Sequence, residues 1–496
     1  MKDKEKRVVV YQTANYSYPK IETALHSSGC YPEFSTELEK LEVDSVYDSV
    51  RNCLHLLGLD ASNFGRQEWN PLSDWGIRPG CSVLIKPNLV MHHNPVEGQG
   101  TECLFTQPSV VVPVIDYVAL ALQGRGKIVI GDAPMQECDF EQLISESGYV
   151  AMIRHYKEKF EKEFNGELQI ELADFRQLRS KPVGLLRKAV IDQSKQGVVV
   201  DLGQKSSFCS ADSKSLQRFR ITNYDPRILI THHTETKHEY MISRYALEAD
   251  FIINMPKPKT HRKAGVTISL KNLVGINARK EYLPHHTLGA IGDGGDEYEK
   301  SSKLHALRSA IIDKRNAHMF EKKYYIARTE NLLIRILTKT IRILQGKNFY
   351  EEGSWYGNHT ISRTINDLNE ILLYANKKGI ICDHKRRKIL TIADMIISGE
   401  KEGPVLPSKK PVGIIAAGFN SVLFDETVST LMGFDFRKIP TIVLALKNKR
   451  LLDGTDITPE IISNNQSWNG KSLFQIDKKE TLHYCPTAGW AGHIEL

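Results

Sequence analysis

The sequence predicts an α/β fold with a mainly parallel sheet, flanking helices, an N-terminal extension and two insertions. Short apolar segments at Ser82–Ile85 and Gly126–Ile130 have strand character, and Val110–Leu122 between them repeats apolar residues at helical spacing. Strand, helix and strand in this order are typical of parallel strands joined by a crossover helix. The composition, 41% hydrophobic and 25% charged over 496 residues, indicates a globular chain of two or three domains, or one large α/β unit with insertions.

The remaining elements follow the same alternation on both sides of this unit. We expect strands at Arg7–Tyr11, Val198–Leu202, Arg227–Thr231, Asp250–Asn254 and Ile414–Ala417. We expect helices at Val43–Leu57, Phe140–Ser147, Glu239–Ala249, Asn331–Leu344, Ile361–Tyr374 and Ser421–Leu431. The expected division of the chain is an extension over 1–78, a core over 79–300 with an insertion at 155–220, a helical insertion over 301–350, the rest of the core over 351–445, and a tail over 446–496.

Charge and cysteine content exclude several classes of protein. The net charge of +7, from 66 Lys and Arg against 59 Asp and Glu, is mild for this length, so nucleic acid is not an expected partner. The eight cysteines are scattered without a C-x-x-C pair, which favours reduced structural residues.

Met1–Arg7 is charged, and the apolar run Val8–Tyr11 is too short for a secretion signal. No segment reaches the roughly 20 apolar residues of a membrane span, so we expect a cytoplasmic location.

The densest polar cluster follows the strand expected at Asp250–Asn254. Two prolines, Pro256 and Pro258, end the strand, and lysines, hydroxyls, a histidine and an amide follow within a short stretch. Lys supplies charge and donors, while Thr, Ser and Asn donate neutrally. The residues of this cluster that we single out are Lys259, Thr260, His261, Lys271 and Asn272. Such a set suits a phosphate or carboxylate ligand.

Further polar residues lie where the fold places a pocket, beyond the carboxyl ends of parallel strands. Lys86 and Asn88 follow one strand, and Asp132 follows the next, where it could also cap the following helix. Late in the chain, Glu402 lies next to an expected turn and Asp425 on an expected helix. These carboxylates could act in acid/base chemistry or balance the basic cluster across a cleft.

The segments VLIKPNLV (83–90), IVIGDAP (128–134), ADFIINMPKPKTHRKAGVTISLKNLVG (249–275), GEKEGPVLP (399–407) and SVLFDETVSTLMGFD (421–435) resemble, in order, the domain-of-unknown-function family 362. Members of that family are uncharacterised as a class, and many are described as iron–sulfur related. This sequence lacks the C-x₂-C-x₂-C-x₃-C-P run that such a cluster requires, so we do not expect one. The matching motif positions include all the polar residues named above.

Two functions from different classes remain open. In the first, the protein is an enzyme, such as an isomerase or transferase, that acts on a small anionic metabolite with a phosphate or carboxylate group. Lys86, Lys259 and Lys271 would hold the anion. Asn88, Thr260 and Asn272 would complete the binding set, and His261 would be the acid or base, partnered by Asp132, Glu402 or Asp425. A divalent metal held by the acids stays open, although no spacing identifies its ligands.

In the second, the protein is a non-catalytic accessory protein that binds an anion or a membrane surface. Residues 331–344 motivate this alternative, because Leu and Ile alternate there with Arg335, Lys339 and Arg342 at helical spacing. Such a helix suits peripheral contact with an anionic lipid surface.

Overall fold

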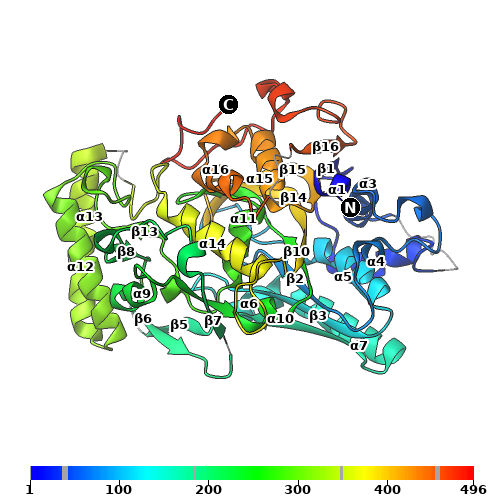
Figure 1. Ribbon diagram of the computed structural model, residues 1–496, viewed down its shortest axis with the longest axis horizontal. Coiled ribbons are helices and arrows are strands. Elements are labelled where there is room, and N and C mark those ends of the chain that lie inside the picture. The colour runs from blue at the N-terminus through cyan, green and yellow to red at the C-terminus, as the bar shows by residue number, and fades with distance from the viewer. Residues whose placement is uncertain (1, 36–42, 184–185, 196, 347–349, 453–457) are drawn as a thin grey trace.

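The computed structural model describes residues 2–35, 43–183, 186–195, 197–346, 350–452 and 458–496, and its centre is a large twisted sheet (Figure 1). From one edge to the other the strands are β16 (Glu460–Ser463), β1 (Arg7–Gln12), β15 (Leu406–Gly418), β14 (Lys388–Glu402), β10 (Phe251–Met255), β2 (Ser82–Pro87), β3 (Gly126–Asp132) and β4 (Leu168–Asp174). Along this path only β15 runs antiparallel to its neighbours. The predicted α/β class with a mainly parallel sheet is therefore confirmed.

Both faces of the sheet are buried because the strands are apolar on both sides. Val83 and Ile85 of β2 pack into one hydrophobic core, whereas Leu84 packs into the other. The first core is formed with α3 (Ser45–Leu56), α4 (Pro71–Trp75), α5 (Pro108–Leu122) and α7 (Tyr149–Phe164). The second is formed with α10 (Arg244–Glu248), α14 (Thr360–Tyr374), α15 (Ser421–Met432) and α16 (Pro440–Lys447). The result is a three-layer α/β arrangement.

Smaller elements surround the sheet. Helices α1 (Lys2–Glu5), α2 (Ile21–His26), α6 (Phe140–Glu146), α8 (Ser213–Leu216), α9 (Pro226–His232) and α11 (Ser269–Asn272) are short. The accessory strand pairs are β5 (Leu178–Val183) with β6 (Leu186–Ile191), β7 (Gly197–Asp201) with β9 (Glu239–Ser243), β8 (Phe219–Arg220) with β13 (His286–Thr287), and β11 (Lys259–His261) with β12 (Gly265–Thr267). Helices α12 (Lys303–Phe320) and α13 (Tyr324–Gln345) form a hairpin at one end of the molecule (Figure 1).

Two sequence expectations were wrong. Residues 227–231 are helical in α9, not a strand, because the Asp225 side chain accepts the amide hydrogen of Arg227 and Pro226 occupies the first helical position. Residues 239–243, expected in a helix, form β9 and pair antiparallel with β7. Tyr240 and Ile242 are buried on alternate positions there, which is the two-residue period of a strand.

The division of the chain into domains stays a prediction. The expected extension over 1–78 contributes β1, which lies inside the sheet between β16 and β15. The expected tail over 446–496 contributes β16, and the expected insertion over 155–220 contributes β4, the opposite edge strand. The segment 301–350 contains the hairpin of α12 and α13.

Candidate functional site

The carboxyl ends of β2 and β3 bring the first site residues together. Lys86 is the penultimate residue of β2, and Asp132 is the last residue of β3. Their side chains form an ion pair of 2.8 Å, with 0% and 5% of the two side chains exposed. Asp132 also accepts the amide hydrogens of Leu89 at 2.7 Å and Ala133 at 2.8 Å. The carboxylate therefore holds the loops that follow both strands.

Gly275 lies against this ion pair so closely that only glycine fits. A Cβ atom there would lie 1.8 Å from Asp132 Oδ1 and 2.7 Å from Lys86 Nζ. The Gly275 carbonyl accepts the amide hydrogen of Ala133 at 2.9 Å. The absence of a side chain at Gly275 lets the segment after α11 approach the end of β3, and the backbone hydrogen bond holds it there.

A chain of side-chain hydrogen bonds, hereafter the relay, links Lys259, Asn88, Asn272 and Asn254. Lys259 Nζ donates to Asn88 Oδ1 at 2.7 Å, and Asn88 Nδ2 donates to Asn272 Oδ1 at 2.9 Å. Asn272 Nδ2 in turn donates to Asn254 Oδ1 at 2.7 Å. Burial and the neighbouring Lys257 lower the pKa of Lys259 to about 7. Because its ammonium group already bonds to Asn88 and to the Leu104 carbonyl, Lys259 positions the relay.

Helix α11 is held in place from a distant part of the chain. Asp425, on α15, accepts the amide hydrogens of Ser269 at 2.8 Å and Leu270 at 3.2 Å, which are the first residues of α11. Burial raises the pKa of the Asp425 carboxyl well above its usual value. By accepting the first amide hydrogens of α11, Asp425 acts as a helix cap that orients Lys271 and Asn272.

A cavity of 230 Å³ lies in front of these residues and is lined by several cations. Lys271 contributes an ammonium group that takes part in no hydrogen bond or ion pair among the residues the structure describes. Burial and the charge of Lys86 lower its pKa to about 8. Lys263 donates to Thr222 Oγ1 at 3.1 Å and has a pKa lowered by burial to about 8. Lys280 bonds to the Pro134 carbonyl, and burial lowers its pKa to about 7.

Two histidines in the cavity wall are neutral but differ in the nitrogen that carries the proton. His261 Nδ1 accepts the amide hydrogens of Lys263 at 3.0 Å and Ala264 at 3.1 Å, so its proton is on Nε2. His285 Nδ1 donates to the Leu283 carbonyl at 2.9 Å, which leaves a lone pair on Nε2. Burial and nearby cations lower the pKa of both rings well below the usual value. The cavity therefore has one neutral imidazole donor and one neutral imidazole acceptor.

Two further polar atoms in the wall have no partner within the described part of the chain. Thr267 Oγ1 and Asn277 Oδ1 are buried, and neither makes a hydrogen bond. Leaving a buried polar group unpaired costs about 1–3 kcal/mol, so such atoms usually face a bound molecule or an ordered water.

The structure brings only part of the predicted site together. Asn88, Asp132, His261, Lys271 and Asn272 line the cavity. The other predicted residues do not line it. Lys86 and Lys259 bond to the lining residues Asp132 and Asn88. Thr260 donates to the Lys401 carbonyl at 2.7 Å, Glu402 accepts the amide hydrogen of Ala488 at 2.8 Å, and Asp425 accepts amide hydrogens of α11. Among the described residues no hydrogen bond joins His261 to any of the three carboxylates proposed as its partners.

The model of the family described as "Domain of unknown function (DUF362)" matches residues 83–182 and 211–430. The chain belongs to this family. The resemblance expected from the sequence is confirmed, and the matched ranges contain every predicted site residue and all the cavity cations described above.

One curated relative aligns with a little over half of this chain. Thylakoid-associated protein sll1697 of Synechocystis sp. is 24% identical over 282 residues, which is 56% of this chain and 62% of the relative. The chain thus spans about three fifths of the length of that relative. No solved structure matches the chain.

Lys280 and Asn277 are two of the cavity residues that the sequence analysis missed. Both follow the basic cluster closely, but neither belongs to a motif, and no periodic signal marks them. Lys263 and Thr267 lie inside the cluster but were not singled out. The available signal was the unusual density of cations after β10, which extends to Lys280.

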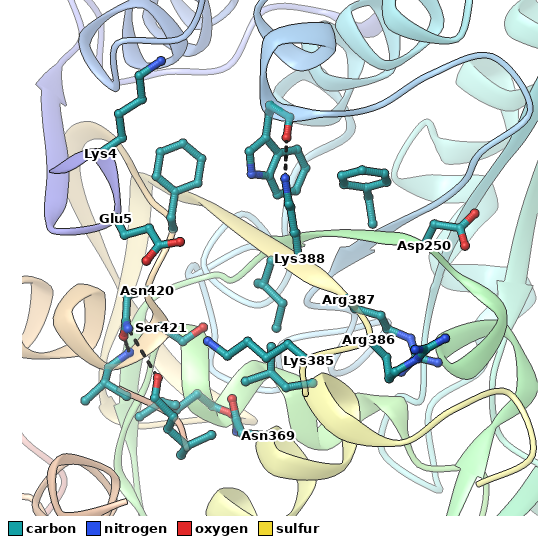
Figure 2. A pocket seen from close by; sticks show the side chains of 18 of the residues that line it. Lys4, Glu5, Asp250, Asn369, Lys385, Arg386, Arg387, Lys388, Asn420 and Ser421 are labelled. Carbon is teal, nitrogen blue, oxygen red and sulfur yellow. Dashed lines mark hydrogen bonds between the residues drawn. The ribbon is translucent and has the colours of Figure 1, made fainter. Parts of the chain in front are cut away.

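A larger pocket of 710 Å³ lies at the opposite end of the strands of this family member, where β10 and β14 begin (Figure 2). Its cations have protein partners. Lys388 Nζ donates to the Trp75 carbonyl at 3.0 Å, and Lys4 pairs with Asp74 at 3.0 Å. Arg387 donates to the carbonyls of Leu372 and Ala375. These three cations differ in this respect from Lys271.

The described ranges offer neither a ready metal centre nor a membrane span. No group of three or more His, Cys, Asp and Glu side chains within them is arranged to hold a metal ion. No helix within them has both the length and the apolar character that crossing a membrane requires.

Proposed function

We propose that the protein is an enzyme that acts on a small metabolite bearing a phosphate or carboxylate group, bound in the 230 Å³ cavity. The observation that carries the proposal is Lys271, a partly buried ammonium group without a counter-ion among the described residues. Burying a charge without a partner is costly, and a bound anion would remove that cost. The neighbouring Lys263 and Lys280 add to the positive potential that favours an anion.

The cavity residues suggest how a reaction would be supported. His261 Nε2–H would donate to an oxygen of the bound metabolite, since its other nitrogen is occupied by two backbone amides. Lys280 has a pKa of about 7, so at neutral pH a substantial fraction is unprotonated and can accept a proton. Asp132 keeps the loops in place, and Asp425 keeps α11 in place. Isomerisation and group transfer are the reaction classes that such a site would serve.

The test is a thermal-shift and calorimetric screen of the purified protein against phosphorylated sugars, carboxylates and inorganic phosphate. Specific binding raises the unfolding midpoint by mass action. We expect a stabilising anion whose effect is lost in Lys271→Met and kept in Lys388→Met, which removes a lysine from the larger pocket. Turnover of the identified compound that is unchanged in Lys271→Met would contradict the proposal. Stabilisation without turnover would favour the accessory protein.

A second candidate function, contact with an anionic membrane surface, is favoured by α13. Tyr325, Leu332, Ile336 and Ile343 recur at helical spacing and are 89%, 59%, 53% and 74% exposed. The opposite face of the helix, with Ala327, Ile334 and Ile341, is buried against the protein. The name of the thylakoid-associated relative is in accord with such a contact.

The basic residues Arg328, Arg335 and Lys339 lie beside the exposed apolar stripe of α13, in sequence positions that place them along one edge of it. An apolar stripe bordered by cations suits an anionic lipid interface, where each cation near the surface contributes about 1 kcal/mol. We propose that this face contacts the membrane from the cytoplasmic side.

Sedimentation with vesicles that contain anionic lipid tests this candidate. We expect pelleting that falls at high salt and that is lost in the triple variant Leu332→Ser, Ile336→Ser, Ile343→Ser. The matched control is Ile291→Ser, Ile380→Ser, Phe474→Ser, because these residues are 53%, 60% and 74% exposed but lie elsewhere. Equal pelleting of the two triple variants would contradict the candidate.

A further inference from the structure

A second positively charged compartment lies next to the cavity. It is a groove of 620 Å³ between the loops at Thr222 and Arg262 and the hairpin of α12 and α13. The walls of the groove and of the cavity share Thr222, Asn223, Arg262, Lys263 and Ser354. The two compartments are therefore neighbours that share part of their walls.

The groove carries an excess of positive charge. Seven basic side chains line it against two acidic ones, Glu351 and Glu352. Arg342 pairs with Glu351 at 2.7 Å, and Arg308 pairs with the same carboxylate at 3.3 Å. Arg262, Arg335 and Lys339 take part in no hydrogen bond through their side chains and in no ion pair within the described ranges.

We propose that the cavity and the groove together bind one elongated metabolite with an anionic group at each end. This inference rests on the proposed function of the cavity. The inner anion lies at Lys271 and His261, and the outer anion lies at Arg335 and Lys339. The chain between the two anions passes Arg262 and Lys263, which belong to both walls.

The physical reason is the placement of unpaired cations on both sides of the shared wall. Arg335 and Lys339 are exposed and Lys271 is half-buried, so a ligand with a single anion would leave the cations on the other side of the shared wall without a counter-ion. A ligand with two linked anions binds the second compartment at the high effective concentration that the link provides. Such a ligand gains affinity over its single-anion analogue without any new contact in the cavity.

Isothermal titration calorimetry with simple alkyl phosphates tests the inference. The probes are n-butyl phosphate and a series of alkane-1,n-diyl bisphosphates of increasing chain length. We expect one chain length to bind at least about tenfold more tightly than n-butyl phosphate. In the double variant Arg335→Gln, Lys339→Gln the bisphosphate should bind only as tightly as the monophosphate, whose own affinity should be almost unchanged.

The matched control is Lys314→Gln, Arg328→Gln. Both residues belong to the same helical hairpin and lie outside the groove, and the change in net charge is identical. We expect this control to keep the preference for the bisphosphate. Unaltered thermal unfolding of both double variants would show that the fold is intact.

Several outcomes separate this inference from the proposed function. Monophosphate binding that requires Lys271, with no bisphosphate preference at any chain length, would overturn the inference and leave the proposed function standing. Absence of binding by every phosphate and by every carboxylate of the thermal-shift screen would overturn both. Vesicle binding that requires Arg335 and Lys339, without a bisphosphate preference, would assign the groove to lipid headgroups and overturn the inference.

Discussion

The cavity and the larger pocket lie at opposite ends of the same sheet and differ in how their cations are satisfied. In the larger pocket Lys388 donates to the Trp75 carbonyl (Figure 2), and Lys4 and Arg387 bond to a carboxylate and to carbonyl oxygens of the protein. In the smaller cavity, Lys271 has no such partner among the described residues. The three cations of the 710 Å³ pocket thus bond to protein oxygens, whereas Lys271 in the cavity of 230 Å³ has no partner among the described residues. The unpaired charge, and not the volume, is the reason for proposing the smaller cavity as the site.

The largest expected difference between the two regions is in the free energy of unfolding that is lost when one carboxylate in each is replaced by an amide. Asp132→Asn leaves Lys86 buried without a counter-ion, which should lower the free energy of unfolding by about 3–5 kcal/mol. Asp74→Asn breaks an ion pair with Lys4 that is 42% exposed on the aspartate side, and should cost under about 1 kcal/mol. Urea unfolding measures both. Equal losses would show that the buried Lys86–Asp132 pair stabilises the fold no more than the exposed Lys4–Asp74 pair does.

The second expected difference between the two regions is in their contribution to anion affinity. Lys271→Met should weaken binding of a stabilising anion by at least about tenfold, since one unpaired cation is removed from the cavity. Lys388→Met removes an ammonium group that already donates to the Trp75 carbonyl and should leave the affinity unchanged. Calorimetric titration with inorganic phosphate provides the comparison. A loss of affinity in Lys388→Met alone would move the site to the larger pocket.

The dependence of anion binding on pH sharpens the comparison further. Lys280 has a pKa of about 7, and Lys271 and Lys263 have pKa values of about 8, so the cavity loses positive charge as the pH rises through these values. Affinity for sulfate, whose charge is constant over that range, should fall by about tenfold, with proton uptake on binding. Titration in buffers of different ionisation enthalpy measures that uptake. An affinity independent of pH would contradict binding at these lysines.

The smallest expected effect is the change in the free energy of unfolding of the ligand-free protein when either lysine is replaced by methionine. Because the folded-state pKa of Lys271 lies below its usual value, its protonated form destabilises the folded protein at neutral pH. Lys271→Met should therefore raise the free energy of unfolding by about 1 kcal/mol, a gain that shrinks as the pH rises above the folded-state pKa of about 8. Lys388→Met should have the opposite sign, since it loses a hydrogen bond. Destabilisation by both changes would show that Lys271 has a structural role.

The sequence by itself determined the fold class and the edge of the sheet where the candidate site lies. Apolar runs of strand length separated by a helical repeat specify parallel strands with crossover helices, and polar residues after each strand then meet at one edge. The motifs after β2, β3 and β10 are therefore enough to bring Asn88, Asp132, His261, Lys271 and Asn272 to one place, and these five residues line the cavity. This inference needs only local patterns and the geometry of a parallel sheet.

Only the tertiary structure decided what each polar side chain does. Lys86 and Lys259 have the same chemistry as Lys271, but contacts with Asp132 and Asn88 satisfy the first two, and the third has no partner among the described residues. Asp425 caps α11 from a helix that lies 156 residues further along the chain. Hydrogen bonding and burial depend on which distant segments meet, and no local pattern in a single sequence encodes that. The sequence thus placed five polar residues at one cavity, and packing decided which contacts each of them makes.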